Sequence, residues 1–234
     1  MKYLLLPLLF VINICFSPNS LSAQAPTTTT LRGTLLGADA KPISKAQVFA
    51  LQFNAVGEKP RSCDVKSNGS FEMNLPYGWY YLEFAGVNHR RERSSIMYFT
   101  NPEAGVRCSL ASNAPEGIID SVKCITSMGS YDFNKQFPLR KQASGEWSID
   151  LPIGDNVKEI GYQIILYVRG SEEDVHSING TAATRYEYDG GGDYRSFVLV
   201  ENGIAHIEYN PAIVPANTAA SSIRFTDTYC SVAQ

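Results

Sequence analysis

The three histidines of the chain are the first residues to consider for acid–base or metal chemistry. His89, His176 and His206 lie far apart in the sequence, and no two of them have the spacing of a metal site. No serine lies in the Gly-x-Ser-x-Gly motif that exposes a catalytic nucleophile, although a Ser-His-Asp group assembled only by folding would leave no such mark. We therefore expect no catalytic residue, no metal and no cofactor, and a protein that is not an enzyme.

Two charged segments are weaker candidates for binding. Residues 89–93 form a small basic cluster that would suit an anionic glycan or a protein partner. Residues 172–174 are acidic and, with Asp189 and Asp193, offer carboxylates of the kind that bind Ca²⁺ in loops. The favoured interpretation of both segments is a solvated loop.

The cysteines bear on the compartment. Without Cys15, which lies in the expected signal peptide, the chain has Cys63, Cys108, Cys124 and Cys230, and none is part of a C-x-x-C motif. An oxidising compartment would allow two disulfides in three possible pairings. The favoured hypothesis is a disulfide between two of Cys108, Cys124 and Cys230, and the alternative is buried free thiols.

The N-terminus is typical of a secretory signal peptide. Lys2 precedes an apolar run over residues 4–16, and Ala23 is a small residue at which cleavage would end the signal. The alternative is an uncleaved anchor. No second apolar stretch is long enough to cross a membrane. We expect residues 1–23 to be removed and the protein to be periplasmic or secreted.

The composition limits the partners. Only 18% of the residues are charged and the net charge is −3, which argues against nucleic acid or an anionic membrane as the main partner. Hydrophobic residues make up 44% of the 234, which is enough for one large or two small packed cores.

The elements expected to position these residues are β-strands. Large apolar residues alternate with polar ones in residues 70–76 and again in residues 146–152, which is the period of a half-buried strand. We expect a hairpin around residues 67–69, a second hairpin that includes residues 144–154, and a third around Asn202-Gly203, a strong turn signal.

These elements predict an all-β protein with two antiparallel β-sandwiches in tandem. The expected domains are a short linker over residues 24–30, a first sandwich over 31–100, a second sandwich over 105–210, and a C-terminal tail over 211–234. Within the tail, residues 222–226 alternate like one more strand.

The first half resembles a known family. The segments that carry the resemblance follow in the family's order: 33–35 (GTL), 41–43 (KPI), 46–48 (AQV), 68–71 (NGSF) and 75–80 (LPYGWY). Over about residues 31–99, this pattern resembles the carboxypeptidase regulatory-like domain. The resemblance implies a prealbumin-like sandwich without peptidase residues, often fused at the N-terminus of exported bacterial enzymes or receptors.

The second half resembles another family. Its segments are 133–134 (FN), 138–141 (PLRK), 144–152 (SGEWSIDLP) and 162–166 (YQIIL). Over about residues 122–209, they are similar to the glycogen-binding module of AMP-activated kinase β subunits and starch-branching enzymes. The resemblance implies an immunoglobulin-like early-set sandwich.

The second resemblance also implies a carbohydrate site. That family stacks sugar rings on exposed tryptophans, and neighbouring amides and lysines bond the hydroxyls. On this basis, Asn134, Lys141 and Asn179 are the candidate carbohydrate-binding residues. Residues 135–136 and Ser171 stand where the family has tryptophan, and we expect Trp147 to lie in the core because it has the inward phase of its strand.

Together these observations predict an exported, non-catalytic binding or scaffolding protein of the bacterial envelope that recognises a protein or glycan partner through sandwich loops. One alternative is an accessory N-terminal region of an envelope thiol reductase or hydrolase. Another is an α-glucan-binding module.

Overall fold

The computed structural model describes residues 27–55, 57–190, 193–216, 219–225 and 230–232, the last of these by their backbone alone. The described residues form strands and two short 3₁₀ turns, and none of them is α-helical. The predicted all-β sandwich architecture is confirmed. No helix of this part of the chain is long and apolar enough to span a membrane. The predicted signal peptide over residues 1–23 lies outside the described residues.

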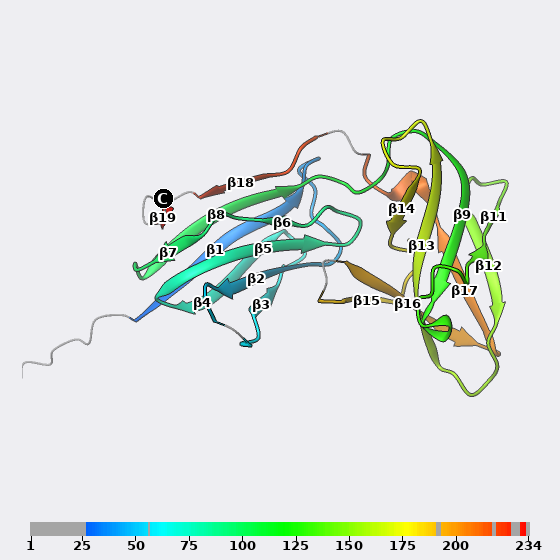
Figure 1. Cartoon of the computed structure of the whole chain (residues 1–234), viewed down its shortest axis with the longest axis horizontal. Helices are drawn as coiled ribbons and strands as arrows, with labels where there is room; N and C mark the ends of the chain where they lie inside the picture. The colour runs from blue at the N-terminus through cyan, green and yellow to red at the C-terminus, as the bar shows by residue number, and fades with distance from the viewer. Residues whose placement is uncertain (1–26, 56, 191–192, 217–218, 226–229, 233–234) are drawn as a thin grey trace, which may run out of the picture.

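The chain folds into two sandwiches that lie one after the other along the molecule (Figure 1). One sheet of the first sandwich has the strand order β18-β8-β1-β4. Its strands are β1 (Thr28–Gly37), β4 (Ser70–Pro76), β8 (Glu103–Leu110) and β18 (Ser222–Phe225). β1 is antiparallel to β4 and parallel to β8, so the sandwich is antiparallel except at this pair.

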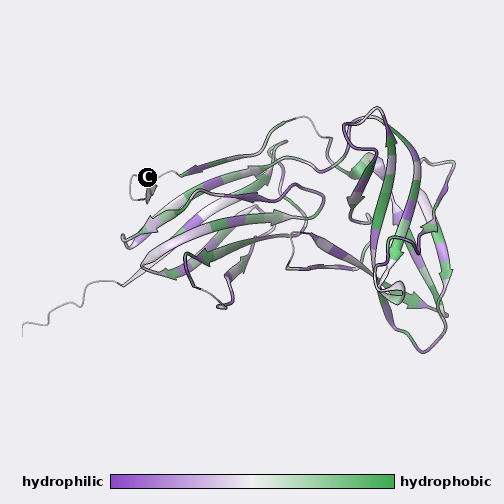
Figure 2. Ribbon diagram, in the orientation of Figure 1, coloured by the Kyte–Doolittle hydropathy of each residue, from purple (hydrophilic) through white to green (hydrophobic). Residues whose placement is uncertain are grey.

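The other sheet of the first sandwich has the order β19-β7-β5-β2-β3, and β6 also pairs with β5. Its strands are β2 (Ala46–Gln52), β3 (Arg61–Asp64), β5 (Gly78–Gly86), β6 (Glu92–Arg93), β7 (Met97–Phe99) and β19 (Cys230–Val232). Hydrophilic and hydrophobic residues alternate along the strands of the sandwich (Figure 2). The apolar positions of both sheets meet in one core, which includes Leu35, Val48, Phe71 and Phe84.

The turn at residues 66–70 differs from the prediction. Gly69 has φ +84° and Asn68 Oδ1 accepts a hydrogen bond from Ser70 N at 3.0 Å, so the expected tight reversal is present. The strands that it joins do not form a hairpin, because β3 pairs with β2 in one sheet and β4 pairs with β1 in the other. The turn therefore carries the chain from one sheet to the facing sheet.

The second sandwich is built from a single curved sheet of order β10-β9-β13-β16-β17-β12-β11, with β14 added to β13 and β15 to β16. β16 pairs first with β13 and, at its end, with β17, so it joins the two faces of the sandwich. The strands are β9 (Ile118–Thr126), β10 (Phe137–Pro138), β11 (Arg140–Lys141), β12 (Trp147–Pro152), β13 (Glu159–Arg169), β14 (Val175–Ile178), β15 (Arg185–Tyr188), β16 (Tyr194–Glu201) and β17 (Ile204–Tyr209), and the 3₁₀ turns are η1 (Ser127–Gly129) and η2 (Pro211–Ile213).

Two of the predicted hairpins are present here. β11 pairs with β12, and β16 pairs with β17 around Asn202 and Gly203, whose positive φ values of 52° and 74° suit a tight hairpin turn. Trp147 is partly buried against the second core, as its strand phase predicts.

The ends of the first sandwich correct the predicted boundaries. β8 belongs to the first sandwich, although a second domain was expected to begin at residue 105, inside this strand. Residues 222–225 and 230–232 belong to the first sandwich and not to a separate tail, because β18 pairs with β8 and β19 pairs with β7. β1 begins at Thr28, inside the expected linker. The first sandwich therefore needs segments from both ends of the chain to complete its sheets.

The described cysteines are free thiols. Cys108 is buried in the first core and Cys124 in the second, so the predicted disulfide does not form between these two. Burial raises the pKa of each of these two thiols to about 12, and it raises the pKa of the half-buried Cys63 to about 11. The side chain of Cys230 lies outside the described residues.

Candidate binding cleft between the sandwiches

The two sandwiches meet along the outer face of β5. The outward side chains of this strand become less exposed along its length, from Trp79 at 37% to Glu83 at 4% and Ala85 at 1%. The covering residues come from β15 and β16, which reach the first sandwich as Figure 1 shows. Ala85, Val87 and Tyr194 form a small apolar cluster here, against which Phe49, Tyr186 and Tyr188 pack.

Glu83 links the sandwiches through polar contacts. Its carboxylate accepts hydrogen bonds from Arg93 Nη2 at 2.9 Å, from Arg91 Nη1 at 3.2 Å and from the hydroxyl of Tyr188 at 2.8 Å. Burial acts to raise the pKa of Glu83, but these hydrogen bonds and the two arginine charges outweigh it, so its pKa lies below the ordinary value. The basic cluster expected as a solvated loop therefore neutralises a buried carboxylate.

A second polar contact lies beside this one. Asn88 N donates to Asn179 Oδ1 at 3.4 Å, and Asn179 N donates to Asn88 Oδ1 at 3.0 Å. Asn179 Nδ2 donates to Tyr194 O and Ser196 Oγ. Asn179 is 4% exposed, so this predicted carbohydrate ligand holds the junction together and has no free side-chain donor to offer a sugar.

A cleft of about 700 Å³ opens where the sandwiches meet. Its lining residues come from the first sandwich and from β15 and β16: Ile43, Ser44, Lys45, Ala46, Gln47, Phe49, Asp64, Val65, Ser67, Tyr186, Glu187, Tyr188 and Tyr194. The aromatic wall is continuous. The rings of Phe49 and Tyr188 lie 4.6 Å apart at 31°, and those of Tyr188 and Tyr194 lie 5.4 Å apart at 64°.

Polar groups of the first sandwich face this wall. Gln47 and Asp64 are register partners on β2 and β3, and Gln47 Nε2 donates to Asp64 Oδ1 at 2.9 Å. The hydroxyl of Tyr194 donates to Gln47 Oε1 at 3.4 Å. Lys45 and Glu187 are exposed at the rim. The cleft thus has hydrogen-bond donors and acceptors beside its aromatic rings, and its charged side chains are of both signs.

The residues that line the cleft include no histidine or cysteine, so the cleft holds no Ser–His or Cys–His pair. In the part of the chain that the structure describes, no group of His, Cys, Asp and Glu side chains could hold a metal ion.

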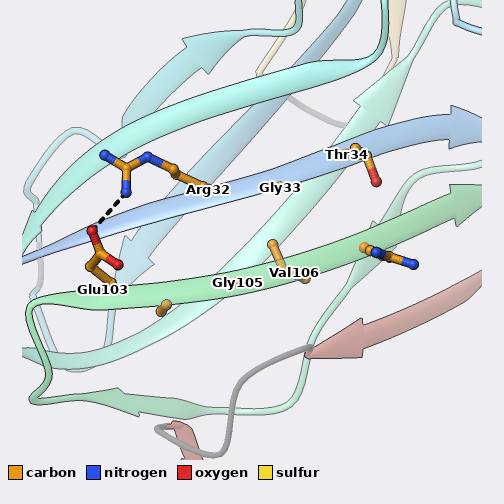
Figure 3. Close-up of a pocket in the computed structure, with 8 residues that line it drawn as sticks. Arg32, Gly33, Thr34, Glu103, Gly105 and Val106 are labelled. Carbon is orange, nitrogen blue, oxygen red and sulfur yellow. Dashed lines mark hydrogen bonds and ion pairs between the residues drawn. The ribbon is translucent and has the colours of Figure 1, made fainter.

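A smaller hollow of about 310 Å³ lies on the outer face of the four-stranded sheet (Figure 3). Arg32 lies beside it, and its guanidinium already donates to Glu72 at 2.8 Å and to Glu103 at 2.9 Å. The hollow has no aromatic side chain in its lining, so it is a poorer candidate than the cleft.

The other two predicted carbohydrate ligands lie on the second sandwich and are not among the residues that line the cleft. Asn134 is exposed after η1, where its Nδ2 and its backbone N–H donate to Asp132 Oδ1. Lys141 is exposed on β11, with its Nζ 5.7 Å from the ring centroid of Trp147. β11 lies on the far side of the second sandwich from the first (Figure 1), so the structure does not bring Lys141 to Asn179. The roles of Asn134 and Lys141 stay a prediction.

The three histidines do not form one site: His176 lines a pocket with Glu172 and Glu173, and neither His89 nor His206 is among the residues that line it. His89 Nδ1 lies 2.8 Å from Val87 O, His176 Nε2 lies 2.7 Å from Glu173 O, and His206 Nδ1 lies 2.7 Å from Asp150 Oδ1. Each histidine therefore has a local structural partner on its own part of the fold.

The residues that line the cleft were not predicted from the sequence. The signals were present but slight: Gln47, Phe49 and Leu51 are the outward positions of β2, and Tyr186 and Tyr188 share one face of β15. An aromatic residue at an outward strand position would be exposed unless another unit covers it or a ligand binds it. These outward aromatic positions were therefore the signal in the sequence from which the cleft could have been predicted.

Comparisons with known proteins give only distant similarities. No protein-family model and no curated protein matches the chain, so the two family resemblances stay predictions. A DUF3823 family protein from Parabacteroides merdae is similar at 12% identity and a TM-score of 0.30, covering 65% of this chain and 98% of its own. A Bacteroides uniformis protein with a suggested carbohydrate-binding role is similar at 7% identity and a TM-score of 0.31. The match covers 64% of this chain and 98% of the Bacteroides chain. Catechol 1,2-dioxygenase from Acinetobacter is similar at 13% identity and a TM-score of 0.27. The match covers 50% of this chain and 51% of the dioxygenase chain. At this level of similarity, these structures carry no conclusion about function.

Proposed function

We propose that the protein is a non-catalytic saccharide-binding protein whose ligand occupies the cleft between the two sandwiches. The observation that carries this proposal is the convergence of Phe49 and three tyrosines with Gln47 and Asp64 in one cleft of about 700 Å³. The aromatic residues come from segments far apart in the sequence, and the fold brings them to one wall.

A saccharide fits this chemistry because its rings have apolar C–H faces and its edges carry hydroxyls. Aromatic rings suit the faces, and amide, carboxylate and ammonium groups suit the hydroxyls as acceptors and donors. The polar groups of the cleft carry both signs of charge at Lys45, Asp64 and Glu187. This mixture favours a neutral or weakly charged sugar over a strongly anionic ligand.

The proposal also covers the cellular compartment of the protein. The pattern of residues 1–23 supports export, and we propose a periplasmic or secreted protein that meets glycans of the bacterial envelope or its surroundings. The same cleft would serve an accessory region that holds an enzyme on a glycan substrate.

A glycan array of short oligosaccharides, followed by calorimetry on the sugars that bind, tests the proposal. We expect specific binding by the purified protein. Phe49→Ala removes a stacking surface and Asp64→Ala removes an exposed acceptor, so each is expected to weaken binding about tenfold.

The matched control is Phe137→Ala, which removes an aromatic side chain that is 39% exposed on the second sandwich. It is expected to leave binding unchanged. If the wild-type protein retains no saccharide, or if Phe137→Ala weakens binding as much as Phe49→Ala, the cleft is not a saccharide site.

A further inference from the structure

We infer that the outer face of the four-stranded sheet binds a tetrahedral oxyanion, phosphate or sulfate, between the guanidinium groups of Arg107 and Arg224. This oxyanion site consists of the two arginines and the hydroxyl groups of Thr34, Ser109 and Ser222. None of these residues lines the cleft, so the inference does not depend on the proposed function.

Strand pairing brings the two arginines together from distant parts of the chain. Arg107 on β8 and Arg224 on β18 are register partners of an antiparallel pair, so their side chains leave the sheet on the same face. The Cβ atoms of such partners lie about 4.5–5.5 Å apart. Both arginines are exposed, whereas their chain neighbours Val106 and Ile223 pack on the first core. Two guanidinium groups can therefore reach one small ion.

The carboxylates of this face are already paired with another arginine. The outward glutamates of the sheet are Glu72 on β4 and Glu103 on β8, and both bond the guanidinium of Arg32, at 2.8 and 2.9 Å. Neither Arg107 nor Arg224 forms an ion pair with a residue that the structure describes. Solvent screens the repulsion between two exposed guanidinium groups, so the pair costs little stability. Its uncompensated positive charge favours an anion as the partner.

Hydroxyl groups flank the two arginines on the same face. Thr34 on β1 is the register partner of Arg107 on the other side of β8. Ser109 and Ser222 are register partners two residues further along, and their hydroxyl oxygens lie 3.0 Å apart. Gly105 has no side chain, and the hollow of about 310 Å³ opens over this part of the sheet (Figure 3). The face thus combines charged donors, hydroxyl donors and space for a compact group.

These donors favour a tetrahedral oxyanion over a carboxylate. A guanidinium group binds a carboxylate through two parallel hydrogen bonds, which engage both carboxylate oxygens in one plane. Phosphate and sulfate have oxygens that point in several directions, so one guanidinium can bond two of them while the second guanidinium and a hydroxyl group bond the others. The charge of these ions also offsets both arginines, which the single charge of a carboxylate does not.

Calorimetric titration at low ionic strength tests the inference. The probes are inorganic phosphate, sulfate and acetate, each added to the purified protein in a buffer that contains none of them. Phosphate and sulfate are expected to bind with a Kd on the order of 1 mM, and acetate about tenfold more weakly. Arg107→Gln and Arg224→Gln are each expected to weaken phosphate binding about tenfold, because either change removes one of the two guanidinium groups.

Arg140→Gln is the matched control, since Arg140 is also exposed, on β11 of the second sandwich, and its replacement changes the net charge by the same amount. It is expected to leave phosphate binding unchanged. If Arg140→Gln weakens binding as much as Arg107→Gln does, the effect comes from net charge and the oxyanion site is wrong. The unfolding temperatures of the three variants without phosphate are expected to equal that of wild type, so a loss of binding reports on the site.

Vesicles distinguish the source of the oxyanion. Phosphatidylglycerol vesicles present phosphate groups on an anionic surface, and neutral phosphatidylcholine vesicles are their control. Flotation with the anionic vesicles that both arginine variants reduce would identify a lipid headgroup, whereas binding of the free ions alone would identify a soluble phosphate or sulfate compound; either result supports the inference. Acetate binding as tight as that of phosphate would overturn it and make this face a contact for an acidic protein segment. Binding of no probe, or equal binding by wild type and both variants, would also overturn it.

Discussion

Gly33 illustrates how a single position in the first sandwich depends on its neighbours. It lies on β1 opposite Phe71, and its missing side chain makes room for that ring. A Cβ built on Gly33 would lie 2.7 Å from the Phe71 ring and still closer to the carbonyl oxygen of Val106. The glycine is therefore required by packing and not by its backbone angles.

Gly33→Ala is accordingly expected to destabilise the protein by about 1–3 kcal/mol, because the extra methyl group forces the ring and the neighbouring strand to move. Chemical denaturation measures the change. Gly129→Ala is the control, since a Cβ there would meet Lys135 at an ordinary 3.6 Å. Equal losses in the two variants would contradict this account of Gly33.

The three predicted carbohydrate residues show the limit of a residue-level resemblance. Asn179 has all its side-chain donors and acceptors engaged at the junction, whereas Asn134 and Lys141 remain exposed. A sequence motif gives the type of a side chain, but its free hydrogen-bonding capacity depends on what the fold places beside it.

At the scale of elements, the first sandwich depends on a strand from the far end of the chain. β18 adds to the edge of β8, and its Ile223 and Phe225 are partly buried against the first core. Its other two residues, Ser222 and Arg224, are exposed. This strand covers a sheet edge that would otherwise present unpaired backbone groups.

The double variant Ile223→Ala and Phe225→Ala is expected to loosen this edge, since it removes the apolar contacts that hold β18 on the core. Hydrogen exchange should show faster exchange of the β8 amides and a loss of about 2–4 kcal/mol in stability. Arg224→Ala, on the exposed face of the same strand, is expected to change neither the exchange of the β8 amides nor the stability. Unchanged β8 protection in the double variant would mean that the edge is stable without β18.

At the scale of the whole molecule, the junction couples two independently packed cores. Glu83 from the first sandwich meets Tyr188 from the second, and the asparagines at 88 and 179 bond each other's backbone. The cleft exists only while these contacts hold the sandwiches together, so the stability of the junction and ligand binding are linked.

Glu83 makes the junction sensitive to pH. Its pKa is lowered in the folded protein, so its stabilisation is complete above the ordinary carboxyl value of 4.5 and is lost as the pH falls below that value. Glu83→Gln is therefore expected to lower stability near neutral pH by about 1–2 kcal/mol, since the glutamine loses the charge-assisted bonds. The difference from wild type should shrink as the pH falls below about 4.

Thermal unfolding across this pH range measures the effect. Glu72→Gln is the matched control, because Glu72 also pairs with an arginine but is half exposed, and such surface pairs contribute little. A Glu83→Gln deficit that is the same at all pH values would show that the carboxylate charge is not what holds the junction.

The period-two alternation of apolar residues was sufficient to predict the all-β class and the strands near residues 70–76, 146–152 and 222–226, and the Asn-Gly pairs were sufficient to predict the tight turns at Asn68-Gly69 and Asn202-Gly203. These features are local, because side-chain direction in a strand and positive φ at a turn are properties of a few consecutive residues. The same pattern shows which face of a strand is buried, but it does not show which other strand will pair with that strand.

Only the tertiary structure decided the partners. It placed β3 and β4 in different sheets and gave β8 and β18 to the first sandwich, because pairing depends on contacts between distant segments. It also assembled the cleft, in which Gln47 and Tyr194 meet across 147 residues of sequence. The outward aromatic residues of β2 and β5 had no assignable role in the sequence, since whether such a side chain is core, junction or binding surface depends on what the fold brings over it.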